Sequence, residues 1–274
     1  MSARILERGI LAAALFGALM FVAGCTTTGD TVGDRPVDDR EAAKANVQLG
    51  IAYLQRGDLP LAKEKLDRAE KQDPRSFEVH WAQAALNERL NQPKEAERYY
   101  QSALKLAPNN AEVSNTYATF LCRAGKVDQA LKLFDSAANN PLYSTPWAAS
   151  TNAAVCLRSD KRDGDAVPYL ERAIVRRPDY APAVVELADV QLALGKPEAA
   201  KAAVDRYLGI GRKSPDVYLV GVRVALKQGD RVMADTLARL LRRDYPNSPQ
   251  AAELQQLLQP GTAAPPAAPP AARP

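Results

Sequence analysis

The chain has 274 residues, of which 46% are hydrophobic and 25% are charged, as in an ordinary soluble protein. Its formal net charge is only +4, and Lys and Arg are interleaved with Asp and Glu instead of forming a basic stripe. Nucleic acid is therefore excluded as a favoured partner. Aromatic residues make up 6% of the chain, and no stretch alternates β-branched with polar residues, so we expect an all-helical protein.

Residues 1–24 have the order of an export signal. Arg4 and Arg8 give a positive start, and an apolar run follows over residues 9–22. This run is too short to cross a bilayer comfortably as a helix. We therefore predict that residues 1–24 are removed and take no part in the fold.

The residues at the end of this segment, Val-Ala-Gly-Cys over 22–25, resemble the lipobox of a bacterial lipoprotein. The resemblance implies that Cys25 is lipidated, with several acyl chains such as palmitate, and becomes the first mature residue. The alternative is an ordinary cleaved signal with an incidental cysteine. Thr26 stands where an aspartate is the usual inner-membrane retention signal, so by analogy we expect anchoring in the outer membrane, facing the periplasm.

Residues 25–40 are polar and contain glycine, proline and four aspartates, so we expect a flexible tether. Beyond it, a pattern of small and large residues occurs twice at a spacing of 34 residues. Its two copies consist of Asn46, Leu49, Gly50, Tyr53, Gly57, Ala62, Leu66, Ala69 and Pro74, and then of His80, Gln83, Ala84, Asn87, Asn91, Ala96, Tyr100, Ala103 and Pro108.

This self-similarity resembles the tetratricopeptide repeat, in which each unit is a pair of antiparallel helices. Small residues such as Gly50 and Ala62 would let the two helices approach closely. Gly57 would allow the chain to reverse, because glycine adopts positive φ without a steric penalty. The closing proline would end the second helix.

Further copies begin near residues 111, 147, 181 and 215, and residues 248–258 form an amphipathic segment suited to cover the last unit. The second copy is weak because Gln83 and Asn87 stand at places for large residues. The predicted fold is an all-α, right-handed superhelix of six tetratricopeptide-like helix pairs plus a C-terminal capping helix, over residues 41–258. Residues 259–274 are rich in Pro and Ala and are predicted to be a disordered tail.

Two cysteines, Cys122 and Cys156, lie one repeat length apart, on the first helices of the third and fourth units. First helices of successive units lie side by side, so the two sulfurs can face each other. An oxidising periplasm favours a disulfide, which we expect. The alternative is two buried free cysteines that act as small apolar residues.

The sequence offers no set of residues for catalysis. His80 is the only histidine, and its place in the repeat favours a packing role. No Cys/His cluster has the spacing of metal ligands, and no glycine-rich loop follows a strand. We therefore expect no catalytic residue, metal, cofactor or small-molecule substrate, and we predict that the chain is not an enzyme.

The remaining function is protein binding. Stacked helix pairs curve so that the first helices line a concave face. In the first unit this face would present Val47, Ile51 and Leu54, and the next two units add Trp81 and Asn115. An apolar groove of this kind would suit an amphipathic or extended partner segment. The alternative is that these side chains cover neighbouring repeats or the tether.

Four segments resemble one particular family of repeat proteins. Residues 113–125 (Val-Ser-Asn-Thr-Tyr-Ala-Thr-Phe-Leu-Cys-Arg-Ala-Gly), with the long connection over 141–146 and Asn-Ala-Ala-Val-Cys over 152–156, are similar to the PilF/PilW family. So is Tyr-Leu-Val-Gly-Val-Arg over 218–223, followed by Gly229. Ala118 and Ala154 stand where the family often has glycine.

The resemblance implies a six-repeat outer-membrane lipoprotein of type IV pilus biogenesis with a pilotin role. Such a protein binds secretin subunits and promotes their localisation and multimerisation in the outer membrane. It also implies that the two matching cysteines are bridged and that the first repeats contact the partner. The alternatives are a generic periplasmic repeat adaptor that recruits envelope-assembly proteins or cell-wall enzymes, and an enzyme hidden in the scaffold.

Overall fold

The computed structural model describes residues 38–259, which form thirteen helices and no strand. The helices are joined by short connections, and all have 13 or 14 residues except α2, with 18, and α14, with 9. They are α2 (Asp39–Arg56), α3 (Leu59–Gln72), α4 (Phe77–Arg89), α5 (Pro93–Leu106), α6 (Ala111–Arg123), α7 (Val127–Asn139), α8 (Pro146–Ser159), α9 (Asp163–Arg176), α10 (Ala181–Ala193), α11 (Pro197–Gly209), α12 (Pro215–Gln228), α13 (Arg231–Asp244) and α14 (Pro249–Leu257).

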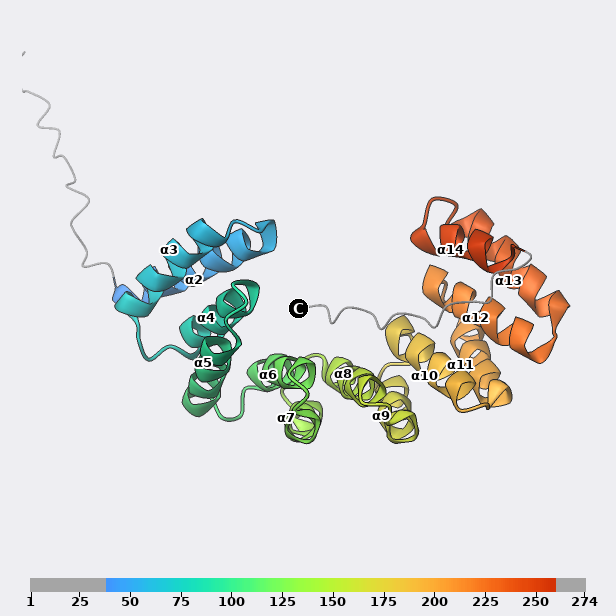
Figure 1. The fold of residues 1–274 in the computed structure, drawn as a ribbon, viewed down its shortest axis with the longest axis horizontal. Helices are drawn as coiled ribbons and strands as arrows, with labels where there is room; N and C mark the ends of the chain where they lie inside the picture. The colour runs from blue at the N-terminus through green and yellow to red at the C-terminus, as the bar shows by residue number, and fades with distance from the viewer. Residues whose placement is uncertain (1–37, 260–274) are drawn as a thin grey trace, which may run out of the picture.

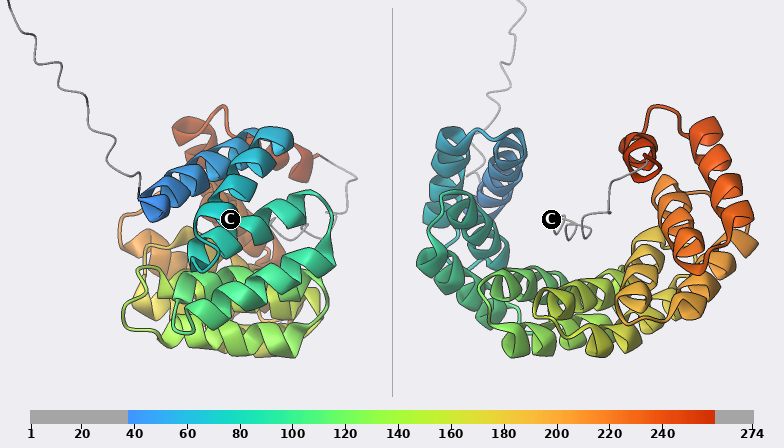
Figure 2. Two further views of the ribbon diagram at one scale, coloured as in Figure 1. Left: turned by 90° about the vertical axis from the view of Figure 1, so that its left-hand side faces the viewer. Right: turned by 45° about the vertical axis from the view of Figure 1, so that its right-hand side comes forward.

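Consecutive helices form six antiparallel pairs, from α2/α3 to α12/α13, arranged in an arc (Figure 1). The first helix of each pair lies on the inner side of the arc and the second on the outer side. The right-hand view in Figure 2 shows the same open arc, with α14 at the end of the array, where it packs on α12 and α13. The predicted all-α superhelix of six pairs with a capping helix is confirmed.

The array begins slightly earlier than we predicted, since Asp39 and Arg40 belong to α2 and not to the tether. The Asp38 carboxylate accepts a hydrogen bond from the Arg40 backbone N–H at 3.0 Å. Asp39 and Glu41 lie in the first turn, where negative charge favours the helix dipole. These acidic residues therefore begin a helix instead of extending a polar linker.

Small residues allow the close approach of the two helices in a pair. A Cβ added at Gly50 of α2 would lie 2.5 Å from Leu66 Cδ2 of α3, far inside van der Waals contact. The alanines at the same place in the next four units, Ala84, Ala118, Ala154 and Ala188, have no exposed surface. The 34-residue pattern is thus a packing pattern.

The turn inside each unit contains a residue of positive φ. Glycine occupies this place in four units, with φ between 71° and 79°, at Gly57, Gly125, Gly195 and Gly229. Asn91 and Lys161 occupy it in the second and fourth units, with φ of 56° and 62°. The left-handed conformation is costly for a residue with a Cβ, so these two turns carry backbone strain that the glycine turns lack.

The connection between α7 and α8 departs from the repeat. Asn140 organises it, since its side chain donates to the Asn109 carbonyl at 2.8 Å and accepts from the Leu142 backbone N–H at 2.9 Å. Tyr143 then packs on four buried alanines, Ala111, Ala137, Ala138 and Ala149. This irregular segment is therefore fixed to the array at both ends.

Candidate functional site

The expected apolar groove of the first unit is not open. Val47 and Leu54 are each only 6% exposed, and they belong to the buried cluster between α2, α3 and α4. Ile51 is half-buried and packs against the same cluster. The interpretation of these residues as a binding surface is corrected, because the face of α2 that carries them packs on Val79, Ala82 and Leu86 of α4.

Trp81 and Asn115, which we expected in the same groove, connect first helices to each other. The Trp81 indole N–H donates to Thr116 Oγ1 at 3.0 Å, which links α4 to α6. Asn152 Nδ2 donates to Asn115 Oδ1 at 3.1 Å, which links α8 to α6. Both side chains are half-buried, and neither joins Val47 and Leu54 in a common site.

Polar contacts join several neighbouring first helices. Arg89 of α4 donates to the Leu54 carbonyl of α2 at 3.1 Å, and Arg123 of α6 pairs with Glu88 of α4. Similar contacts continue in the second half of the array, where Arg158 of α8 pairs with Glu186 of α10, and Arg223 of α12 pairs with Asp189 of α10 at 3.0 Å.

The two carboxyl groups on α10 lie largely out of solvent. Burial raises the pKa of both Glu186 and Asp189, and the neighbouring guanidinium groups of Arg158 and Arg223 offset only part of that rise. Both carboxyl groups therefore take up a proton at a higher pH than an exposed carboxyl group would.

The cysteine pair lies at the centre of the array. Cys122 of α6 and Cys156 of α8 form a disulfide, with their Cα atoms 5.7 Å apart. The bond joins two first helices of neighbouring units across the irregular connection between α7 and α8. The two sulfurs are thus brought together, and the alternative of two free cysteines does not describe this structure.

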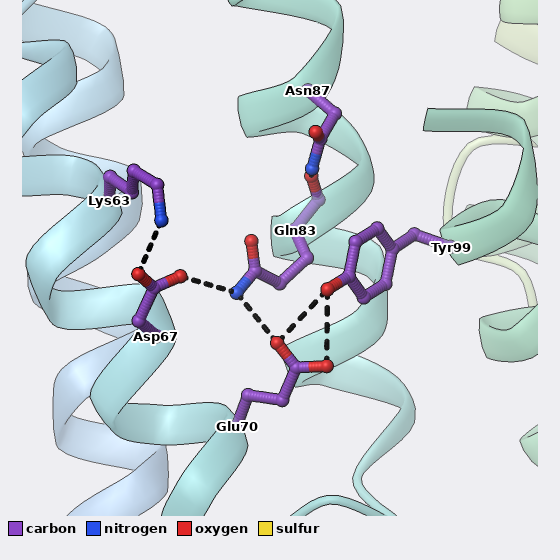
Figure 3. A network of polar contacts seen from close by, with 6 residues as sticks. All are labelled: Lys63, Asp67, Glu70, Gln83, Asn87 and Tyr99. Carbon is purple, nitrogen blue, oxygen red and sulfur yellow. Dashed lines mark hydrogen bonds and ion pairs between the residues drawn. The ribbon is translucent and has the colours of Figure 1, made fainter. Parts of the chain in front are cut away.

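A cavity of about 210 Å³ lies between α3, α4 and α5, and we call it the α3–α5 pocket. Its polar contacts are drawn in Figure 3. Gln83 of α4 donates its side-chain amide to Asp67 Oδ1 at 3.3 Å and to Glu70 Oε2 at 3.0 Å, both on α3. Tyr99 of α5 donates to Glu70 at 3.0 Å, and Asn87 donates to the Gln83 carbonyl at 2.8 Å.

The acidic side of this network affects Tyr99. Burial, together with the nearby Glu70 charge, raises the pKa of the Tyr99 hydroxyl. Tyr99 therefore stays protonated and acts as a hydrogen-bond donor to Glu70 at neutral pH. Lys63 pairs with Asp67 at the rim, so one of the two carboxylates on α3 has a cationic partner.

Only one feature of the sequence pointed to this pocket. Gln83 and Asn87 are polar residues at places where the repeat has large residues, and we interpreted them only as a weakness of the second copy. The other members, Lys63, Asp67, Glu70 and Tyr99, were not predicted. They are ordinary surface residues by sequence, and they come together only when α3 and α5 flank α4.

His80 takes the packing role expected of it. Its Nε2 lies 2.9 Å from the Pro74 carbonyl oxygen, and its ring lies 5.7 Å from that of Tyr99. Within residues 38–259, no group of three or more His, Cys, Asp or Glu side chains could hold a metal ion. In the same part of the chain, no helix has the length and apolar character needed to cross a membrane. Cys25 lies outside the described residues.

Comparisons with known families agree with this geometry. One family model described as tetratricopeptide repeat matches residues 47–111 and 118–181, and a second with the same description matches residues 89–141 and 157–220. Together the matches extend over more than half of the chain. The stacked helix pairs and these matches define the class: the chain is a tetratricopeptide-repeat protein.

Comparison with individual relatives identifies a narrower group than the family models do. The type IV pilus assembly protein PilF of Pseudomonas aeruginosa is 29% identical over 247 residues, which is 90% of this chain and 98% of the relative. The solved PilF structure has a TM-score of 0.62 and covers 80% of this chain and 99% of its own. The structure of PilW, a type IV pilus biogenesis factor, is 27% identical, with a TM-score of 0.63 over 79% of this chain and 98% of its own. The chain is homologous to PilF and PilW and belongs with them in one family of tetratricopeptide-repeat proteins.

Proposed function

We propose that this protein is a non-catalytic assembly factor of a type IV pilus system, and that it acts as a pilotin. It would bind secretin subunits and promote their localisation and multimerisation in the outer membrane. The observation that carries the proposal is the homology to PilF, which extends over 98% of that protein and 90% of this chain. The similarity therefore includes the whole array and not one repeat.

The physical mechanism would be tethering. Lipids on Cys25 would hold the array at the outer membrane, and each bound secretin subunit would be kept there at a raised effective concentration. Contacts such as Arg89 to Leu54 and Arg123 to Glu88, together with the disulfide, hold the first helices in register. A scaffold held in this way presents its surfaces without a large ordering cost on binding.

The test is the abundance of secretin multimers in outer-membrane fractions of a strain that lacks the protein. We expect multimers to be lost in the deletion strain and restored by the wild-type gene. The Cys25→Ala variant should fold normally but fail to restore them at the outer membrane. The matched control is Thr28→Ala, which changes a residue of the same polar segment and keeps the cysteine of the anchor.

The second candidate function is a lipid-anchored adaptor for other cell-envelope assembly proteins or cell-wall enzymes. It rests on the repeat fold, which serves protein binding in general. Secretin multimers that persist at the outer membrane without the protein would reject the pilotin role and favour this adaptor.

A further inference from the structure

A second cavity, of about 470 Å³, lies beside the irregular connection between α7 and α8, and we call it the α7–α9 pocket. It is lined by two asparagines at the C-terminal end of α7 and by Pro141, Tyr143, Pro146, Trp147 and Arg176. Residues 140–145 form the longest connection between any two of the described helices. The pocket therefore belongs to the departure from the repeat, and its lining combines two aromatic rings with two prolines.

The two aromatic side chains are held in place from behind. The guanidinium carbon of Arg177 lies 4.6 Å from the centre of the Trp147 ring, and Arg177 in turn pairs with Asp179 at 3.2 Å. Tyr143 packs against the cluster of four buried alanines between α6, α7 and α8. Both rings are only half-buried, so each keeps surface that a ligand can contact.

A lining of aromatic rings favours one class of peptide ligand. Proline-rich segments in the polyproline II conformation bind aromatic-lined grooves, and they are already ordered before they bind. Their backbone carbonyls make no internal hydrogen bonds, so a groove that binds them needs donors. Arg176 supplies one, since its guanidinium has five N–H donors and one nitrogen, Nη1, donates to the Ala138 carbonyl.

The chain itself contains a segment of this class. Residues 260–274, which lie outside the described residues, include six prolines, with Pro-Pro-Ala-Ala-Pro-Pro over 265–270. Pro266 and Pro269 form a Pro-x-x-Pro motif, which is typical of polyproline II ligands. The proposed pilotin mechanism uses no residue of this segment.

The segment is long enough to reach the pocket within one chain. It follows α14, and contacts between helices lead from α14 through α12 and α10 to α8. At about 8–10 Å between the axes of packed helices, these three steps amount to roughly 24–30 Å. Residues 260–269 span up to roughly 33–36 Å when extended, at about 3.3–3.6 Å per residue. Their length therefore permits an intramolecular contact.

We propose that the α7–α9 pocket binds the Pro-x-x-Pro motif of its own chain in the polyproline II conformation. The two prolines of the motif would pack on the rings of Tyr143 and Trp147. The Arg176 guanidinium would donate to a carbonyl oxygen between them. The inference goes beyond the proposed function, because it concerns the third and fourth units and a segment that takes no part in tethering secretin subunits.

Fluorine nuclear magnetic resonance of the full chain labelled with 5-fluorotryptophan tests the contact. The chain has two tryptophans, of which Trp147 lines the pocket and Trp81 contacts Thr116 of α6 elsewhere in the array. The Trp81→Phe variant assigns the two signals. We expect Pro266→Gly/Pro269→Gly to shift the Trp147 signal, because it removes the motif from the pocket, and to leave the Trp81 signal in place.

A matched variant and a peptide make the test specific. Pro260→Gly/Pro274→Gly replaces the same number of prolines but keeps residues 265–270, so it should leave the Trp147 signal unchanged. A synthetic peptide of residues 260–274, added to the Pro266→Gly/Pro269→Gly chain, should restore the wild-type Trp147 signal in a saturable manner. The same peptide with both substitutions should bind at least about tenfold more weakly.

Four outcomes would overturn the proposal. The first is an identical Trp147 signal in the wild type and in Pro266→Gly/Pro269→Gly. The second is an equal shift in the matched variant, and the third is an equal response to the two peptides. The fourth is a wild-type signal that changes on dilution, which would mean that the segment of a second copy occupies the pocket. None of these outcomes depends on the secretin measurement, so the two proposals fail separately.

Discussion

Single side chains determine how closely the helices of this array can approach. Gly50 contacts Leu66 so closely that no Cβ fits between them, and a Cβ added at Gly221 would likewise lie 2.6 Å from Leu237 Cδ1. Gly164 of α9, in contrast, has nothing within 4 Å of the place its Cβ would take. The same residue type therefore has a packing role in the first two positions and none in the third.

Gly50→Ala is expected to destabilise the protein by about 1–3 kcal/mol, because the added methyl overpacks the α2/α3 contact. The melting temperature measured by circular dichroism checks this. Gly164→Ala is the control, and it should leave the melting temperature unchanged or raise it slightly, since alanine is the better helix former. Equal effects of the two substitutions would contradict the packing argument.

Glu186 gives a prediction on pH. Its pKa in the folded state is raised above the ordinary value of a glutamate, chiefly by burial, so folding favours its protonated form. The stabilisation from this group is complete at pH values below the unfolded-state pKa and is lost as the pH rises through the folded-state pKa.

The Glu186→Gln variant, which keeps an acceptor for Arg158, lacks this dependence. We therefore expect the melting temperature of the variant, relative to that of the wild type, to rise as the pH is increased from the ordinary pKa of a glutamate upwards. Thermal melts of both proteins over this range measure the difference. If the melting temperature of the wild type instead rises relative to that of the variant with increasing pH, the contact with Arg158 outweighs burial in its effect on the pKa of Glu186.

At the scale of helices and turns, the fourth unit carries strain that its neighbours avoid. Lys161 adopts the left-handed conformation that Gly125 and Gly195 adopt in the units on either side. Lys161→Gly should therefore stabilise the protein by about 1 kcal/mol. Gly125→Lys, where nothing lies within 4 Å of the added Cβ, should destabilise it by a similar amount. Urea unfolding followed by circular dichroism measures both, and effects of the same sign would refute the argument.

The disulfide between α6 and α8 gives a further prediction at this scale. Cys122→Ala/Cys156→Ala should lower the free energy of unfolding by about 2–4 kcal/mol, because a cross-link restricts the unfolded chain. A reducing agent such as tris(2-carboxyethyl)phosphine should lower the stability of the wild type by a similar amount and leave the double variant unaffected. A reductant effect of the same size on both proteins would show that it does not act through this bond.

For the whole molecule, the sequence predicted the fold well and the surfaces poorly, and the reason is physical. Each unit repeats the same local packing. Small residues such as Gly50, Ala62 and Ala69 therefore predict a helix pair without information from the rest of the chain. The direction in which Val47 and Leu54 point depends on how α4 packs on α2, which no local pattern encodes. The α3–α5 pocket combines residues of three helices from two units. In the sequence, only Gln83 and Asn87 depart from the repeat pattern there, because they are polar at places for large residues.

The central disulfide also determines how the array responds to mechanical force. A pull applied to the two ends of the chain passes from Cys122 to Cys156 through the sulfur–sulfur bond and bypasses the residues between them. The chain between the cysteines, whose sequence separation is 34, then cannot extend, which removes roughly 110–120 Å of contour length at about 3.3–3.6 Å per residue. Under tension, the irregular connection between α7 and α8 therefore lies within the segment of the chain that carries no load.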